Sequence, residues 1–415
     1  MSINNVLALL ISLAAIFSYI NAKWIKLPTT IGLLLISVLM SLGLLLLGYF
    51  GFHLDAHAQA VLRTIDFNET LMQGMLSALL FAGALHVNLE DLNREKWVVT
   101  ILASFGVIVS TFIVGFAAYL ILPYLGVQLP LIYCLLFGAL IAPTDPIAVL
   151  GILKSVGAPK SLETTIAGES LFNDGVAVVV FLVLLGFVAS GNGHAQAELS
   201  VLSVLKLFAQ EAIGGIGFGL VVGYISYKML ESIDNYQVEL LITLALVFGG
   251  YSLAMALHLS GPIAIVVAGL LIGNTGRQLA MSDKTREHLD MFWELVDEIL
   301  NAVLFVLIGL ELLILVLDKN YLWAGLMMIP VTLAARFISV AIPITLMKAR
   351  RSFSPKVIQI LTWGGLRGGI SIALALSLPA GAERDAILVI TYIIVLFSIM
   401  VQGLTVNKLI PKPSI

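Results

Sequence analysis

The sequence predicts an all-α protein that crosses a membrane about thirteen times. Of its 415 residues, 60% are hydrophobic and only 11% are charged, whereas about a quarter of the residues in a typical soluble protein are charged. The mean hydropathy is +1.06, and long apolar runs recur from one end of the chain to the other. A net charge of −3 gives no reason to expect a nucleic-acid partner. The single cysteine, Cys134, excludes an internal disulfide.

Apolar stretches bounded by polar residues, proline and glycine define the expected spans, because a helix needs about 20 apolar residues to cross a bilayer. The thirteen expected spans cover residues 3–22, 28–50, 68–88, 97–121, 130–153, 163–189, 201–227, 236–257, 260–273, 289–317, 321–347, 355–378 and 385–409. The longest polar stretches, residues 51–66, 190–200 and 274–288, are expected to be loops. The N-terminus lacks the basic segment of a cleaved signal peptide, so we expect the first span to be retained.

The basic residues of the connections fall mostly on one side of the membrane. If the first connection is cytoplasmic, sixteen of them lie on that side: Lys23, Lys26, Arg94, Lys96, Lys154, Lys160, Lys228, Arg277, Lys284, Arg286, Lys348, Arg350, Arg351, Lys356, Lys408 and Lys412. Only three, Arg63, Lys319 and Arg384, lie on the other side. This positive-inside bias predicts an N-terminus outside and a C-terminus in the cytoplasm. The remaining three, Lys206, Arg336 and Arg367, fall within spans.

The sixth expected span carries four polar side chains within six residues: Glu169, Ser170, Asn173 and Asp174. A charged carboxylate near the middle of a bilayer costs roughly 3 kcal/mol or more. On a helix, Glu169 lies one turn from Asn173 and Ser170 one turn from Asp174, so the four form one polar stripe. We therefore expect this stripe to face a functional site and not lipid.

Two other spans contain residues that interrupt a helix. The fifth contains Pro143-Thr144-Asp145-Pro146, and the twelfth contains Gly364-Gly365-Leu366-Arg367-Gly368. The prolines leave backbone carbonyls free, which is tolerated at membrane depth only beside protein or a wet cavity. The two spans are seven apart and therefore run in opposite directions, as in secondary transporters built from inverted repeats, here spans 1–6 and 8–13. The alternative is that proline and glycine are simply common in membrane helices.

Four motifs together resemble the monovalent cation:proton antiporter-1 family of sodium/proton exchangers. They are PTDP at 143–146, GESLFNDG at 168–175, FWE at 292–294 leading to Gly309, and GGLRG at 364–368. The resemblance covers essentially the whole chain and implies a thirteen-helix fold, a homodimer and an elevator-like exchange of sodium, lithium or sometimes potassium for protons. It also implies a dimerisation bundle made of residues 1–96 and 191–318, and a core transport bundle made of residues 97–190 and 319–415.

Asp174 is the expected carrier of both the cation and the proton. Removing a carboxylate from water favours its protonated form, so the same oxygens can hold a proton and a hard monovalent cation in turn. The alternative is a structural pair with a basic residue, although no Lys or Arg lies near it in sequence. Asp145 is expected to be a second ligand or to compensate the half-helix ends. Thr144 and Ser170 are expected to supply neutral oxygen ligands, with capping of the break as the alternative.

Four more residues are expected to organise the site. Asn173 stands where electrogenic relatives carry Asp, which implies electroneutral exchange of one cation for one proton, and it is expected to tie the two broken helices together. Glu169 is expected to pair with Arg336 of the eleventh span, as in relatives. Arg367 is expected to neutralise carbonyl ends at the break in the twelfth span, with a side chain that snorkels to the cytoplasm as the alternative.

Acidic residues also begin the tenth span. Glu294, Asp297 and Glu298 are candidates for a cytoplasmic funnel that concentrates cations, although acids are favoured near the N-terminus of any helix. Two positions depart from the resemblance. Some archaeal relatives carry a ligand carboxylate on the third span, where this chain has Ala82. Animal exchangers carry an acid that meets the arginine of the twelfth span, where this chain has Asn301.

These features predict a secondary active antiporter and not an enzyme. The expected Na⁺ ligands are Asp174, Asp145, Ser170 and Thr144, and no cofactor is expected besides the transported ions. The alternatives are a cation channel, which would need several weakly occupied sites, and a carrier for an organic anion, which would need basic site groups. The expected partners are a second copy of the chain and membrane lipids, and the expected location is the inner membrane of a prokaryotic cell.

Overall fold

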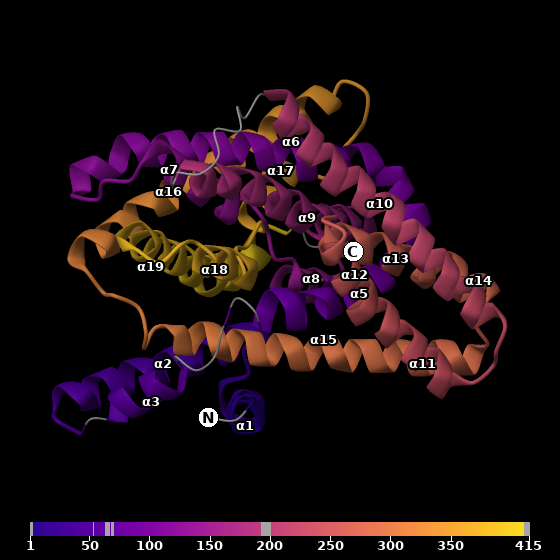
Figure 1. Ribbon diagram of the computed structural model, residues 1–415, viewed down its shortest axis with the longest axis horizontal. Helices are drawn as coiled ribbons and strands as arrows, with labels where there is room; N and C mark the ends of the chain where they lie inside the picture. The colour runs from indigo at the N-terminus through magenta and orange to yellow at the C-terminus, as the bar shows by residue number, and fades with distance from the viewer. Residues whose placement is uncertain (1–2, 53, 63–66, 68–69, 192–200, 411–415) are drawn as a thin grey trace.

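The computed structural model describes residues 3–52, 54–62, 67, 70–191 and 201–410, and helices make up nearly all of this part of the chain (Figure 1). The helices are α1 (Ile3–Ile20), α2 (Thr29–Tyr49), α3 (Leu54–Leu62), α5 (Leu76–Leu85), α6 (Leu89–Ile121), α7 (Leu131–Ile141), α8 (Ile147–Ser155), α9 (Lys160–Gly191), α10 (Val201–Glu231), α11 (Tyr236–Leu244), α12 (Gly250–Ala256), α13 (Gly261–Leu271), α14 (Arg277–Leu279), α15 (Asp283–Glu311), α16 (Lys319–Met347), α17 (Val357–Trp363), α18 (Gly369–Leu376), α19 (Ala382–Phe397) and α20 (Gly403–Thr405). Short π-helical segments extend or join several of them, at Asn21–Ile25, Thr70–Met75, Ala245–Gly249, Ile272–Gly276 and Ser398–Gln402.

Each expected span falls on one or two of these helices. Among the described residues, eight helices are long and apolar enough to cross a membrane, and Thr70–Leu85, Leu131–Ile141 and Gly261–Gly276 are shorter apolar helices. α15 is long but does not join the eight, because charged side chains are spread along it from Asp283 to Glu298. The protein is therefore an all-helical, polytopic membrane protein.

Some boundaries differ from the expected ones for local reasons. α6 begins at Leu89, well before the expected residue 97, because the Oδ1 atom of Asn88 accepts hydrogen bonds from the backbone N of Glu90 and Asp91 at 2.8 and 3.1 Å. α15 covers Asp283–Glu311 and not 289–317, because Ser282 caps its first turn. α3 forms within residues 51–66, which were expected to be a loop.

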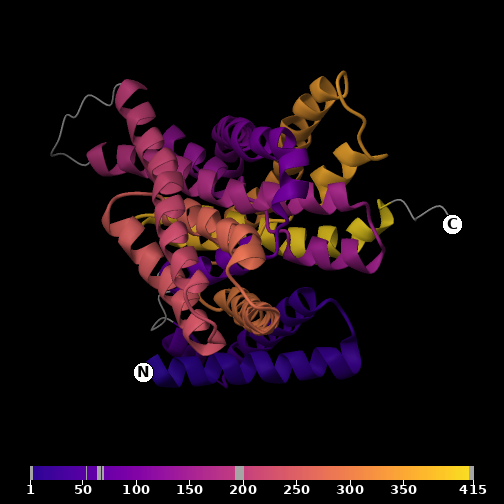
Figure 2. The same cartoon turned by 90° about the vertical axis from the view of Figure 1, so that its right-hand side faces the viewer.

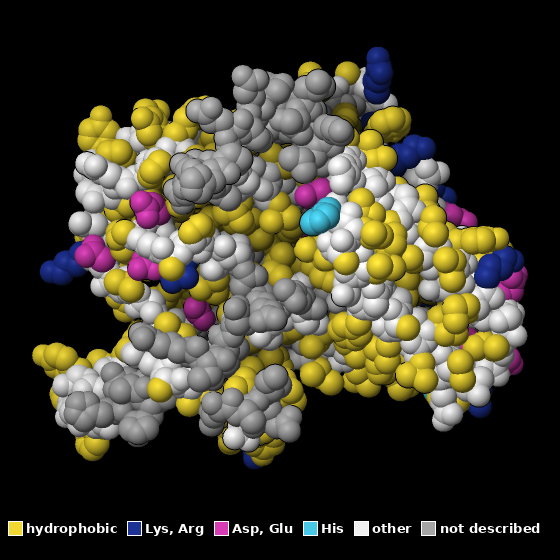
Figure 3. Space-filling view, in the orientation of Figure 1, with side chains coloured by type: hydrophobic (Ala, Val, Ile, Leu, Met, Phe, Trp, Pro, Cys, Tyr) yellow, Lys and Arg dark blue, Asp and Glu magenta, His cyan; other side chains and the backbone are white. Residues whose placement is uncertain are grey.

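The helices form two neighbouring groups. In one, α6 packs against α7, α9 and α16, and α16 packs against α19; in the other, α15 packs against α2 and α5, and α10 against α13. In both ribbon views α15 lies between α1 and the rest of the bundle (Figures 1 and 2). The surface seen in Figure 3 is largely hydrophobic, with Lys and Arg side chains near its margins, as expected for helices surrounded by lipid.

The two interrupted helices occur where the sequence predicts them. α7 ends at Ile141 and α8 begins at Ile147, while α17 ends at Trp363 and α18 begins at Gly369. The extended segments between them meet at one antiparallel bridge, in which the backbone N of Asp145 donates to the carbonyl oxygen of Leu366 at 2.7 Å. Four half-helix ends therefore surround one point inside the protein.

Candidate functional site

Asp145 lies between the N-termini of two half-helices. Its Oδ1 atom accepts a hydrogen bond from the backbone N of Ile147, the first residue of α8, at 2.9 Å. Its other carboxylate oxygen lies against Gly368, where an added Cβ atom would come within 2.6 Å of Oδ2. Because a helix N-terminus carries a partial positive charge, α8 and α18 both favour a negative charge at this position.

Three buried polar side chains link α9 to the break in the fifth span. The hydroxyls of Thr144 and Ser170 are 2.9 Å apart, and Asn173 donates from Nδ2 to Thr144 Oγ1 at 2.8 Å. Asn173 Oδ1 also accepts from the backbone N of Thr144 at 3.3 Å. The sequence analysis expected Asn173 to tie the two broken helices to each other, but the bonds of Asn173 to Thr144 form a different link. Asn173 ties α9 to one break, whereas backbone atoms join the two breaks.

Asp174 follows on the same helix and is withdrawn from lipid. It is 8% exposed, and it lines the same cavity as Asp145. The two carboxylates are close enough for their charges to interact. None of the ion pairs found among the described residues involves Asp174. Its carboxylate is therefore held in the protein interior without a basic side chain to neutralise it.

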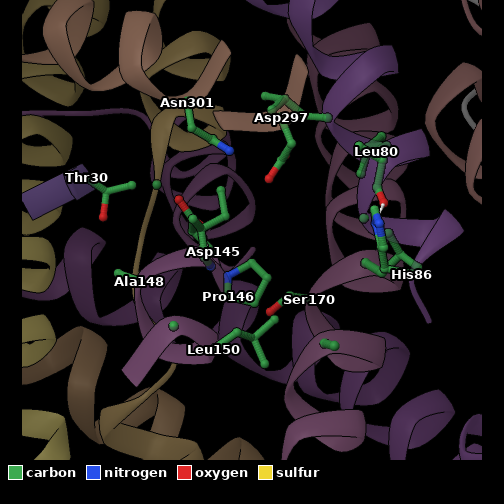
Figure 4. Close-up of a pocket in the computed structure, with 18 of the residues that line it drawn as sticks. Thr30, Leu80, His86, Asp145, Pro146, Ala148, Leu150, Ser170, Asp297 and Asn301 are labelled. Carbon is green, nitrogen blue, oxygen red and sulfur yellow. Dashed lines mark hydrogen bonds between the residues drawn. The ribbon is translucent and has the colours of Figure 1, made fainter. Parts of the chain in front are cut away.

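An open cavity of about 1240 Å³ brings these groups together (Figure 4). All four sequence-predicted cation ligands line it: Thr144, Asp145, Ser170 and Asp174. Seven of the lining residues are acidic, namely Asp91, Asp145, Glu163, Asp174, Glu294, Asp297 and Glu298. Among the described residues, the only Lys or Arg in the lining is Lys160. A cavity with this charge balance attracts cations and repels anions.

The acidic residues of α15 lie on the wall of this cavity and not at the helix end. α15 begins at Asp283, so Glu294, Asp297 and Glu298 lie about three to four turns inside it. The field of a helix terminus falls off within its first turn. A preference for acids at helix N-termini therefore does not account for their positions, whereas a negatively charged approach to the site does.

Glu169 of α9 and Arg336 of α16 form a buried, bidentate ion pair. Both guanidinium nitrogens Nη1 and Nη2 donate to the Glu169 carboxylate, the second at 2.9 Å. Arg336 also donates from Nε and Nη2 to the carbonyl oxygen of Leu361, near the end of α17, at 3.3 and 3.1 Å. Gly365 permits this approach, because a Cβ atom there would lie 2.6 Å from Arg336 Nε. One arginine thus serves both the ion pair and the broken helix.

Arg367 has a different role from the expected one. It lies in the break of the twelfth span, but its Nη1 donates to the carbonyl oxygens of Ala142 and Pro143, the latter at 2.9 Å. These carbonyls belong to the break in the fifth span. Pro146 cannot donate to the carbonyl of Ala142, and the backbone N of Ile147 donates to Asp145 and not to the carbonyl of Pro143. The two breaks cross, so the side chain reaches the carbonyls of the other break and not those of its own. It is also buried, so it does not snorkel to the cytoplasm.

The break in the twelfth span is supported by residues that the sequence argument missed. Gln402 donates from Nε2 to the carbonyl oxygen of Trp363 at 2.9 Å, and Ser398 Oγ accepts from the backbone N of Arg367 at 2.9 Å. Both lie on the last span. Two polar residues inside that apolar run are the sequence signal that could have identified them. Ala82 and Asn301 also line the cavity, so neither departure from the family pattern lies outside the site.

Comparisons with known proteins agree with this architecture. The chain matches the family described as "Sodium/hydrogen exchanger, transmembrane" over residues 9–411. It is 52% identical over 415 residues to the Na⁺/H⁺ antiporter NhaP of Pseudomonas aeruginosa, covering 98% of this chain and 96% of that protein. It is 36% identical over 408 residues to the Na⁺/H⁺ antiporter NhaH of Halobacillus dabanensis, again covering 98% and 96%.

The fold has a solved counterpart. The structure of the sodium proton antiporter MjNhaP1 from Methanocaldococcus jannaschii at pH 8 superposes with a TM-score of 0.76 at 22% sequence identity, covering 97% of this chain and 96% of that chain. The chain therefore belongs to the transmembrane sodium/hydrogen exchanger family, and it is a membrane transporter and not an enzyme.

Proposed function

We propose that this sodium/proton antiporter couples its two fluxes by competition between the cation and the proton for Asp174. The observation that carries the proposal is an unpaired, buried carboxylate facing an acid-lined cavity at the crossing of two broken helices. The desolvated Asp174 side chain is neutral with a proton bound and neutral again with a monovalent cation bound. It holds one of the two at a time, and neither ion crosses unless the other returns.

The cation would be held by oxygen ligands from both helices at the crossing. Asp174 and Ser170 come from α9, while Thr144 and Asp145 come from the fifth-span break. Carboxylate and hydroxyl oxygens suit a hard cation such as Na⁺ or Li⁺, with K⁺ as a larger alternative. Thr144 and Ser170 bond to each other in this structure, so a bound cation would take over lone pairs that both hydroxyls have available.

One-for-one, electroneutral exchange follows from the number of carboxylates left to titrate. Glu169 is held by Arg336, Asn173 cannot ionise, and Asp145 is held between two helix N-termini. Asp174 then remains as the single proton carrier of the α9 stripe. Each cycle moves one positive charge in each direction.

The exchange would proceed by alternating access in a homodimer. We assign the moving core to residues 97–190 and 319–415 and the dimerisation bundle to residues 1–96 and 191–318, in a thirteen-span fold with inverted repeats. α6, α7, α9, α16 and α19 pack more extensively with one another than with α15, α2 and α5, which supports this division. With the N-terminus outside a prokaryotic inner membrane, the exposed cavity residues Asn88 and Lys160 would lie on the cytoplasmic side, and we assign the structure to an inward-facing state.

The test is sodium-driven proton movement in proteoliposomes with Asp174→Asn and Asp174→Ala. We expect exchange to fall by at least about a hundredfold in both, because the only titrating group of the stripe is lost. Correct folding is checked by the elution profile and melting temperature in detergent. Exchange near the wild-type rate in either folded variant would remove Asp174 from the mechanism.

The same vesicles report the stoichiometry. Clamping the membrane potential with valinomycin and potassium should leave the sodium-driven proton flux of the unmodified protein unchanged, because no net charge moves. A flux that follows the imposed potential would contradict exchange of one cation for one proton.

A further inference from the structure

Two residues on one face of α15 line the cavity, away from the α9 stripe. Asp297 and Asn301 are four residues, or about one helical turn, apart. Asn301 is 3% exposed, and its Oδ1 atom has no hydrogen-bond partner among the residues that the structure describes. An unsatisfied buried acceptor costs about 1–3 kcal/mol, so its retention beside a carboxylate points to a ligand that it receives.

A second unpartnered oxygen lies on the facing helix. Ser371, in the first turn of α18, is 1% exposed, and its Oγ atom has no partner within the described part of the chain. The start of α18 lies directly against α15, because a Cβ atom on Gly369 would come within 2.7 Å of Leu304. Asn301 precedes Leu304 by three residues on α15, so Asn301 and Ser371 both lie near the junction of α15 and α18. Both residues line the cavity.

Asp145 completes this group. Asp297 and Asp145 are close enough for their charges to interact. Figure 4 shows the Asp297 carboxylate directed toward Asp145, with the nitrogen end of the Asn301 amide extending toward the space between them. Two carboxylates, one amide and one hydroxyl side chain thus belong to residues that line one cavity. Thr144, by contrast, bonds to Ser170 of α9.

We propose that Asp297, Asn301 and Ser371, together with Asp145, form a second monovalent-cation site, which we call the vestibule site. Oxygen donors of this kind suit a hard cation that keeps part of its water. Asp145 is shared between the vestibule site and the Asp174 site, so a cation can pass from one to the other without losing all its charged ligands. This delivery role rests on the proposed function, whereas cation binding at the vestibule site does not.

The experiment measures binding of radioactive ²²Na⁺ to detergent-solubilised protein in which Asp174→Asn has removed the inner carboxylate. We expect one saturable Na⁺ site to remain. It should weaken by at least about tenfold when Asp297→Asn is added, because a carboxylate in a low-dielectric cleft raises the local cation concentration by that order or more. Asn301→Ala should weaken it severalfold, and Asn301→Asp should restore or tighten it.

Two controls separate a built site from general negative charge. Glu287→Gln removes an exposed acid from the same helix, outside the cavity lining, and should leave binding within about twofold of its parent. Glu298→Gln removes the neighbouring acid of the lining and should have a clearly smaller effect than Asp297→Asn. Equal losses for the last two would mean a diffuse acidic funnel and would overturn the vestibule site.

The proposal is also overturned if Asp174→Asn abolishes all saturable Na⁺ binding, or if Asn301→Ala and Asp297→Asn bind as their parent does. Failure of the proposed function gives a different result. In that case Asp174→Asn still exchanges sodium for protons in vesicles, whatever the binding experiment shows for Asp297.

Discussion

Gly368 shows how little freedom the residues of the crossing have. The N-terminus of α18 approaches the Asp145 carboxylate so closely that even one methyl group at this position would meet its Oδ2, Cβ and Cγ atoms, at 2.6, 2.7 and 3.0 Å. The backbone angles of Gly368 are extended, with φ −120° and ψ −162°, so glycine is required here by contact and not by conformation. The absence of a side chain lets the helix dipole act on the carboxylate at short range.

Gly368→Ala should therefore lower the apparent affinity for the cation. The added methyl must push Asp145 away from α18, and overpacking of this kind costs about 1–3 kcal/mol. The measurement is the sodium concentration that gives half-maximal exchange in proteoliposomes, which we expect to rise by roughly tenfold.

Gly151→Ala is the matched control. Gly151 also lines the cavity, within α8, but a Cβ atom there would meet nothing within 4 Å. Alanine favours the helix by about 1 kcal/mol over glycine, so this variant should be at least as stable as the unmodified protein with an unchanged sodium dependence. If both variants behave alike, close packing on Asp145 does not set the affinity.

At the scale of helices, two arginines satisfy the carbonyl groups that the broken helices leave free. Arg367 serves the end of α7 from the crossing segment, and Arg336 serves the end of α17 from α16. Free carbonyls inside a membrane must find donors in the protein or in water. Each arginine therefore holds a half-helix in place, and Arg336 connects that support to the helix that carries Asp174 through its pair with Glu169.

Removing one partner of the Glu169–Arg336 pair should destabilise the protein, because the other partner is left as an uncompensated buried charge. Arg336→Gln strands a buried carboxylate and the Leu361 carbonyl, and it should cost about 3–5 kcal/mol. Glu169→Gln leaves Arg336 its bond to Leu361 and should cost less. The double variant should be more stable than Arg336→Gln, because no buried charge is left unpaired, but less stable than the unmodified protein.

The measurement is the melting temperature in detergent of the three variants, read as a double-mutant cycle. Glu231→Gln is the control, because it breaks the exposed Lys228–Glu231 pair, whose side chains are 50% and 41% exposed. Exposed pairs contribute about 0–1 kcal/mol, so this variant should melt close to the unmodified protein. If the double variant loses the sum of the two single losses, the two charges do not stabilise each other.

At the scale of the whole molecule, the expected spans and both breaks could be predicted because their causes are local. Hydropathy marks spans, and prolines and glycines mark breaks. The way in which the two breaks cross is not a local property of the sequence. The sequence analysis therefore assigned Arg367 to the carbonyls of its own break and Asn173 to a link between the two broken helices. It also gave α15 too late a start, because capping by Ser282 acts before the apolar run begins. The acids of α15 could be assigned to a cavity wall only once the helix start was known.

The orientation of the molecule is open to direct measurement. Lys160 in the cavity lining and Lys319 at the start of α16 are both exposed, and five expected spans, an odd number, separate them. The only native cysteine, Cys134, is fully buried, so an engineered cysteine can be labelled over a low background. A membrane-impermeant maleimide should label Lys160→Cys only in inside-out vesicles and Lys319→Cys only in intact cells.

The two variants control for each other, and the unmodified protein should remain unlabelled in both preparations. Labelling of both positions from the same side would contradict an odd number of spans between them, and with it the thirteen-span topology. The reverse pattern would place the N-terminus in the cytoplasm. The acid-lined cavity would then open to the outside, and the conformation described here would be the outward-facing one, in which the vestibule site receives the cation from the external medium.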